Sequence, residues 1–168
     1  MKLLENDPTL ADMCRQIESA IGEDPRCQGL QVVVRLTSLD ALPESAKTDV
    51  FRDGGGAYRR STREVLLDPC LLSMNSSVAV AVIAHEVGHA VAHAKGMQWE
   101  GDGANDPMAE EFIADRLACE WGFEHSLVAE RHTSYGEEYV VALRKWPDER
   151  TYRHAMNLWR TKRIAGLV

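Results

Sequence analysis

Residues 75–96 of this 168-residue chain have the sequence NSSVAVAVIAHEVGHAVAHAKG. Asn75 is a favourable N-cap residue and Gly96 a favourable C-terminal stop, so the stretch predicts a helix that runs to about Lys95. The segment Val78–Ala84 is apolar on every side of that helix. A helix that is apolar all round is buried and does not lie on a surface. We therefore expect this helix at the centre of the fold.

Three polar side chains interrupt the apolar helix in the pattern H-E-x-x-H, at His85, Glu86 and His89. Residues four apart lie on one helical face with Cβ atoms about 5–6 Å apart, so both imidazoles can bind one Zn²⁺. Glu86 is rotated away from that face, where its carboxylate can contact a metal-bound water. An unsatisfied buried polar group costs about 1–3 kcal/mol. The pattern therefore predicts a zinc site in which the histidines are ligands and Glu86 is the general base.

A catalytic zinc usually has a third protein ligand and an open position for water. The metzincin extension is absent, because Ala92 and Lys95 occupy the places of its Gly and His. Further along the chain, Glu111 and Asp115 are spaced to share one face of the next helix. Glu111 can be the third ligand, while Asp115 can accept a hydrogen bond from the far ring nitrogen of a ligating histidine. Glu110 and Asp115 are the competing ligands, since a change of one residue rotates a carboxylate by about 100°.

The pairing of H-E-x-x-H with the later E-x-x-A-D at Glu111–Asp115 resembles the gluzincin metallopeptidases. It is similar to the HtpX and CAAX-prenyl-protease family, and almost equally to the ImmA/IrrE family of peptidases. The similarity extends from about Arg63 to Gly122. HtpX-type enzymes are embedded in membranes and ImmA-like peptidases often adjoin a helix-turn-helix domain, and the sequence shows neither feature. The resemblance implies zinc ligands at His85, His89 and Glu111, a general base at Glu86 and a supporting carboxylate at Asp115.

Three segments predict a small sheet that contains antiparallel strands. Leu30–Leu36 is rich in β-branched residues, and Ala57–Arg60 and Arg63–Leu67 are spaced as a hairpin. Leu39–Gly56, which ends in three glycines, predicts a mobile loop. We expect the strand Glu64–Leu67 to be an edge to which an extended substrate adds.

The remaining segments predict helices. Asp7-Pro8 pairs an N-cap acid with a proline at the first helical position, and apolar residues recur at helical spacing until Gly22. Asp106-Pro107 begins a helix that closes at Gly122, and two more helices are expected at about 136–146 and 148–165. We therefore predict an α+β fold, a minimal zincin-like domain spanning residues 1–168. Its small sheet packs on the buried H-E-x-x-H helix, and its C-terminal part is helical.

The composition of the chain limits which partners and which cellular compartment we expect. The chain has 19 basic and 26 acidic residues, and the net charge of −7 disfavours a nucleic acid or an anionic membrane as partner. The first residues lack the apolar core of a signal peptide, and the longest strongly apolar run, Val78–Ala84, is far shorter than the roughly 20 residues that cross a bilayer. The four cysteines are scattered, which indicates reduced thiols. We expect a cytoplasmic protein.

These observations predict a zinc-dependent endopeptidase that acts on a protein or peptide. Zn²⁺ lowers the pKa of its bound water, Glu86 removes the proton, and the proton then passes to the leaving amine. Two alternatives stay open, a gluzincin-fold module that binds or regulates without turnover and a zinc hydrolase of a non-peptide amide. Because the chain has little room for a separate substrate domain, an adaptor or regulatory protein is a further expected partner.

The residue that stabilises the oxyanion has no motif to select it. His93 continues the stripe of His85 and His89 by one turn, and we expect it at the mouth of the cleft and not as a ligand. The candidates for oxyanion stabilisation are His132, Tyr135, Tyr139, Tyr152, Arg153 and His154.

Overall fold

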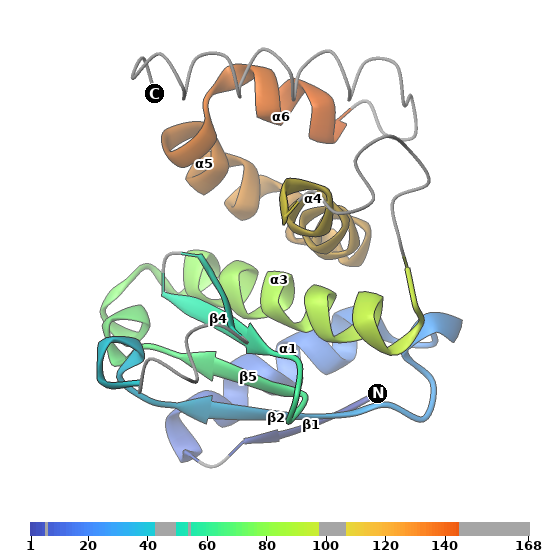
Figure 1. Ribbon diagram of the computed structural model, residues 1–168, viewed down its shortest axis with the longest axis vertical. Coiled ribbons are helices and arrows are strands. Elements are labelled where there is room, and N and C mark those ends of the chain that lie inside the picture. Colours follow the sequence, from blue (N-terminus) through green and yellow to red (C-terminus); the bar gives the residue numbers. More distant parts are fainter. Residues whose placement is uncertain (6, 43–49, 54, 98–106, 145–168) are drawn as a thin grey trace.

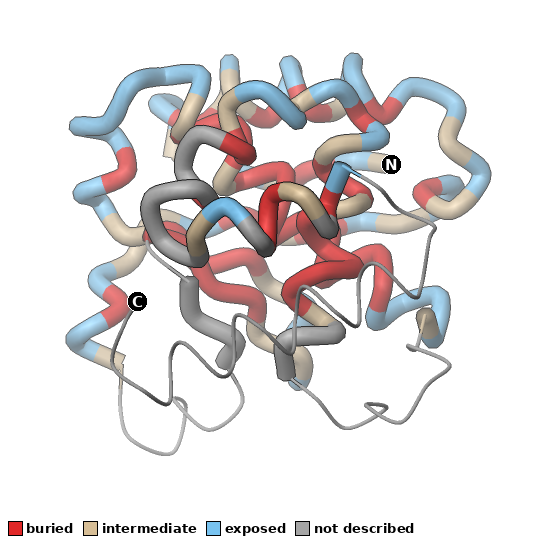
Figure 2. Tube along the Cα trace, turned by 90° about the horizontal axis from the view of Figure 1, so that it is seen from above, coloured by how far each residue is buried: buried red, intermediate tan, exposed pale blue. Residues whose placement is uncertain are grey.

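A computed structural model describes residues 1–5, 7–42, 50–53, 55–97 and 107–144. The architecture is α+β, as the sequence predicts. Figure 1 shows three layers: a sheet, the long helix α3 across one of its faces, and the helices α4, α5 and α6 on the far side of α3. Figure 2 shows that the buried residues gather in the middle of the molecule. Most residues of α3 are among them, so α3 lies within the core.

The sheet has five strands in the order β1-β2-β5-β4-β3. β1, β2 and β5 are parallel, whereas β4 is antiparallel to both β5 and β3. Their bounds are β1 Lys2–Glu5, β2 Gln31–Leu36, β3 Val50–Asp53, β4 Gly56–Arg59 and β5 Glu64–Leu67. The predicted strand at 30–36 and the predicted hairpin are therefore confirmed as β2, β4 and β5.

Two expectations about the sheet are wrong. β5 pairs with β2 on one side and with β4 on the other, so Glu64–Leu67 is an interior strand and offers no edge to a substrate. The stretch 39–56 is not simply a loop, because it contains the 3-10 turn Leu39–Ala41 and the edge strand β3. Residues 43–49 and 54 of that stretch lie outside the described part. β1 was not expected at all, since its pairing with β2 joins segments far apart in the sequence.

The predicted ends of the first helix and of the central helix agree with the structure. A 3-10 turn at Pro8–Leu10 leads into α1 at Ala11–Ile21, and the Asp7 side chain accepts a hydrogen bond from the Thr9 backbone N–H at 2.9 Å. α3 spans Ser76–Ala94, capped by Asn75 Oδ1, which accepts from the Ser77 N–H at 3.0 Å. Gly96 follows it with φ 60°, a left-handed conformation that favours glycine.

α3 shares one apolar core with α1 and the sheet. By length and by its hydropathy of 1.2, α3 passes as a helix that could span a membrane. However, 72% of that window is buried inside the fold. The apolar surface of α3 is thus covered by protein, and we treat it as a core helix.

The C-terminal helices are divided at other residues than predicted. The helix expected from Pro107 to Gly122 ends as α4 at Pro107–Ala118, and a π-helical turn, Cys119–Phe123, follows it. Gly122 has φ 95° and kinks the chain there. α5 (Glu124–Tyr135) was not expected, whereas α6 (Glu137–Arg144) matches the helix predicted near 136–146. The helix expected at 148–165 lies outside the described residues.

Candidate metal centre

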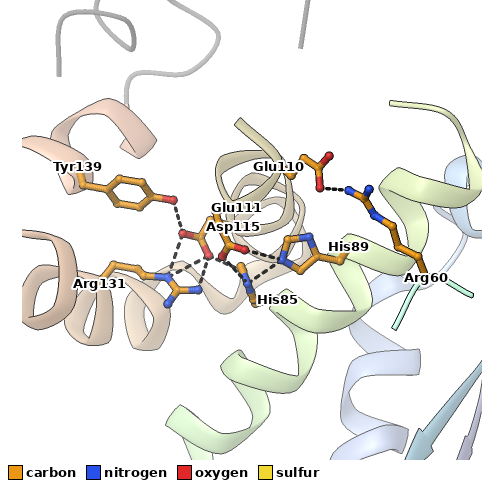
Figure 3. A network of polar contacts seen from close by, with 8 residues as sticks. All are labelled: Arg60, His85, His89, Glu110, Glu111, Asp115, Arg131 and Tyr139. Atoms are coloured by element: carbon orange, nitrogen blue, oxygen red, sulfur yellow. Dashed lines mark hydrogen bonds and ion pairs between the residues drawn. The ribbon is translucent and has the colours of Figure 1, made fainter. Parts of the chain in front are cut away.

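Gly88 lets α3 and α4 approach closely. A Cβ at position 88 would lie 2.7 Å from the carbonyl oxygen of Ala114 and 2.9 Å from its Cα. These are backbone atoms, so a larger residue at position 88 would have to push α4 away. The close crossing places Glu111 and Asp115 of α4 beside the histidines of α3, as Figure 3 shows.

Three side chains converge between the two helices. His85 Nε2 lies 3.1 Å from His89 Nε2 and 3.2 Å from Glu111 Oε2, and His89 Nε2 lies 3.3 Å from Glu111 Oε1. All three residues are buried. Ligand atoms about 2.0–2.1 Å from a tetrahedral zinc are separated by about 3.3 Å, so the observed spacings fit such an ion. Within the described part of the chain, this cluster could therefore bind a metal.

Asp115 lies behind His85 and outside the cluster. Its Oδ1 is 2.6 Å from His85 Nδ1, and its side chain is fully buried. A carboxylate at the far ring nitrogen fixes the tautomer and directs Nε2 at the metal position. The structure thus brings the two histidines, Glu111 and Asp115 together in the arrangement expected from the sequence.

The pKa shifts describe a cluster that attracts positive charge. Burial lowers the pKa of His85, but the charge and hydrogen bond of Asp115 and the hydrogen bond of Glu111 together raise this pKa well above its ordinary value. Burial raises the pKa of Glu111, yet the charges and hydrogen bonds of His89 and His85 outweigh it and hold this pKa well below its usual range. The carboxylates that favour a positive charge on His85 also favour a divalent cation in its place, once the proton has left. The donor set therefore fits zinc.

Glu110 and Glu111 are distinguished by their partners. Glu110 pairs with Arg60 of the segment after β4, and 39% of its side chain is exposed, against 9% for Glu111. Since α4 turns by about 100° per residue, only one of the two carboxylates can face the histidines. That residue is Glu111.

Glu86 is buried but is separate from the converging atoms, as the sequence pattern suggests. Its carboxylate lies against β4, where a Cβ at Gly56 would be 2.6 Å from Glu86 Oε1 and 2.7 Å from its Cγ. The absence of a side chain at position 56 thus makes room for the carboxylate of Glu86.

A cavity of about 150 Å³ opens beside the cluster. His89 forms part of its wall and stacks on Tyr58 with an interplanar angle of 7°. The Tyr58 hydroxyl lies 2.9 Å from His93 Nδ1, and His93 also lines the cavity. His93 therefore lies at the cavity and not among the converging ligand atoms.

The structure adds Arg131, a residue that was not predicted from the sequence. It is buried on α5 and hydrogen-bonded to Asp115. A signal was present, because Arg131 follows Leu127 and Val128 at helical spacing and so shares their buried face.

Tyr139 is not placed as an oxyanion stabiliser would be. It is fully buried on α6, and its hydroxyl donates to Asp115 Oδ2 at 2.6 Å. Burial, more than any other cause, raises the pKa of Tyr139 well above its ordinary value, and the negative charge of Asp115 raises it further. The side chains of the other candidates lie outside the described part of the chain, namely His132, Tyr135, Tyr152, Arg153 and His154.

Comparison with known proteins agrees with this geometry. Residues 26–101 match a family described as "Putative neutral zinc metallopeptidase", a range that includes β2, β4, β5 and all of α3. Neither the curated proteins nor the solved structures contain a match to the chain. The family match and the buried cluster of His85, His89 and Glu111 together support a zinc metallopeptidase.

Proposed function

We propose that this protein is a zinc-dependent endopeptidase of the gluzincin type. The observation that carries the proposal is the convergence of two imidazole nitrogens and one carboxylate at spacings of 3.1–3.3 Å, with the buried Glu86 directly after His85 on the helix that carries both histidines. In this proposal His85, His89 and Glu111 hold the ion. When bound, Zn²⁺ supplies a Lewis acid that polarises a carbonyl and lowers the pKa of water at its open position.

Glu86 is the general base in this proposal. Its carboxylate removes a proton from the attacking water and passes it to the nitrogen of the leaving amine. Burial against Gly56 keeps the carboxylate in one place, and a positioned base contributes about 10²–10⁴-fold to a rate. Asp115 holds His85 in the tautomer that leaves Nε2 available as a ligand.

The substrate is an extended peptide segment. The cavity of about 150 Å³ beside His89 has room for a side chain, but not for a folded partner. β3 is an edge strand that pairs with β4, and β4 carries the Gly56 backbone against which Glu86 lies. An extended peptide that adds to this edge would be held mainly through its backbone, which implies broad specificity. We place this activity in the cytoplasm, with selectivity supplied by an adaptor or regulatory protein.

Replacement of Glu86 by Gln tests the function. We expect Glu86→Gln to bind zinc with the stoichiometry of the wild type and to lose peptide hydrolysis by at least about 10²-fold, because an amide cannot accept the proton. The measurements are elemental analysis of zinc and cleavage of casein or a peptide library, with and without a chelator. Glu23→Gln, the same change at an exposed position, is the matched control and should retain full activity.

Two results would contradict the proposal. Full hydrolysis by Glu86→Gln would remove Glu86 as the base. A wild-type chain that binds zinc without cleaving any peptide would favour either a binding or regulatory module or a hydrolase of a non-peptide amide, and assays on small amides would separate those two.

A further inference from the structure

Asp115 is a junction between three helices. Its carboxylate contacts His85 of α3, Arg131 of α5 and Tyr139 of α6, as Figure 3 shows. His85 Nδ1 lies 2.6 Å from Oδ1, and the Tyr139 hydroxyl donates to Oδ2 at 2.6 Å. The side chains of Asp115 and Arg131 are 0% and 4% exposed, so water does not compete for these contacts.

Arg131 donates hydrogen bonds to both oxygens of the Asp115 carboxylate. Its Nε donates to Oδ1 at 3.1 Å and to Oδ2 at 3.0 Å, and its Nη2 donates to Oδ1 at 3.0 Å. A planar guanidinium that contacts two carboxylate oxygens restricts rotation of the carboxylate as well as compensating its charge. A buried carboxylate without such a partner would be left with an uncompensated charge, which strongly destabilises a fold. Arg131 therefore sets the orientation of Asp115 and makes its burial possible.

Tyr139 also restricts the rotation of the Asp115 carboxylate. Its donation to Oδ2 leaves Oδ1 as the oxygen that faces His85. Tyr139 is itself held by packing, because its ring meets the ring of Phe112 on α4 edge-on, with centroids 6.2 Å apart. With Asp115 fixed in this way, a rotation of the His85 imidazole would break its contact with Oδ1 and move its Nε2 from its place 3.1 Å from that of His89 and 3.2 Å from Glu111.

We propose that Arg131 and Tyr139 are positioning residues of the zinc site, which act through Asp115 to hold His85 in its ligating orientation. This inference rests on the proposed zinc site. It makes α5 and α6 part of the metal centre, although neither helix contributes a ligand among the described residues. Both residues also lie outside the segment 26–101 that matches the metallopeptidase family.

The test measures zinc affinity and the geometry of the bound ion, separately from catalysis. Tyr139→Phe removes one hydroxyl and keeps the ring, while Arg131→Met removes the charge and keeps most of the side-chain length. Loss of support to a ligating histidine typically costs 10–100-fold in metal affinity, so we expect each variant to bind Zn²⁺ about 10-fold or more weakly in competition with a chromophoric chelator. We also expect the visible absorption bands of the Co²⁺-substituted variants to shift from those of the wild type.

The controls separate positioning from folding. Arg144→Met removes an exposed arginine of α6 that pairs with Glu124, and it should leave zinc affinity unchanged. Arg131→Lys keeps the charge without the two-pronged contact, and its zinc affinity should lie between those of Arg131→Met and the wild type. Circular dichroism and the Tm of each apoprotein show whether the variant folds.

The outcomes distinguish this inference from the proposed function. If Tyr139→Phe folds, binds zinc as tightly as the wild type and gives an unchanged Co²⁺ spectrum, the positioning role is refuted while the zinc site stands. Tyr139→Phe decides the matter even if Arg131→Met fails to fold. A wild-type chain that binds no zinc would overturn the zinc site itself and this inference with it.

Discussion

Gly56 and Glu86 occupy adjoining space although they belong to different elements. The built Cβ at position 56 comes within 2.6 Å of Oε1 and 2.7 Å of Cγ of Glu86, so even a methyl group would displace the whole end of that side chain. φ at Gly56 is not among the positive values of this chain, and a substitution there therefore meets a steric obstacle and not a conformational one. At the residue scale, the position of Glu86, the proposed general base, depends on a glycine of the sheet.

Gly56→Ala should lower kcat by about 10²-fold, because a misplacement of a catalytic group by about 1 Å can cost that much. Zinc affinity should stay near that of the wild type, since the displaced residue is not a ligand. Steady-state kinetics and a zinc competition assay measure the two effects. Gly55→Ala is the matched control, because a Cβ there meets the Leu71 side chain and not Glu86. Wild-type kcat in Gly56→Ala would show that Glu86 tolerates the displacement.

At the scale of elements, the site depends on the crossing of α3 and α4. α3 is buried along most of its length and supplies both histidines, whereas α4 supplies Glu111 and Asp115 from one face. Gly88 lies at the contact and meets the backbone of Ala114. The separation of the two helices therefore sets the distance between the histidines and the carboxylates.

Gly88→Ala should weaken zinc binding by more than about 10-fold, because α4 would move outward and take Glu111 and Asp115 with it. Overpacking of this kind also costs about 1–3 kcal/mol of stability. Gly29→Ala is a control for stability alone: Gly29 has φ 74° and no atom within 4 Å of an added Cβ, so strain should lower its Tm without affecting zinc. Equal zinc affinity in Gly88→Ala and the wild type would contradict this role of the helix contact.

At the scale of the whole molecule, the metal centre lies between two structural layers. One apolar core joins the sheet, α1 and α3 to residues of α4 and α5, and the C-terminal helices lie on the side of α3 that faces away from the sheet (Figure 1). The buried polar contacts of Asp115 link α4 to α3, α5 and α6. Binding of an ion at this junction should therefore stabilise the fold as a whole, by mass action on the folded state.

The rise in Tm on adding zinc should increase as the pH rises from about 6 to 8. The pKa of His85 is raised in the folded apoprotein, so its contribution to stability is fully present below the ordinary value of 6.5 and is lost as the pH rises through the raised pKa. Zinc must displace that proton, so its binding also tightens with pH. Thermal unfolding with zinc and with a chelator, in buffers across this range, measures the difference. A zinc-induced shift that stays constant or shrinks would contradict it.

The sequence by itself determined α1 and α3, the capping residues Asp7 and Asn75, the hairpin of β4 and β5, and the residue types of a candidate zinc site. These features follow from contacts within a few residues, such as Asn75 with Ser77 or the histidines one turn apart. Only the tertiary structure decided the strands β1 and β3, the interior place of β5, the choice of Glu111 over Glu110, and the contacts of Arg131 and Tyr139 with Asp115. Each of these depends on partners brought together from distant parts of the chain, and local periodicity carries no information about which distant group a side chain or strand will meet.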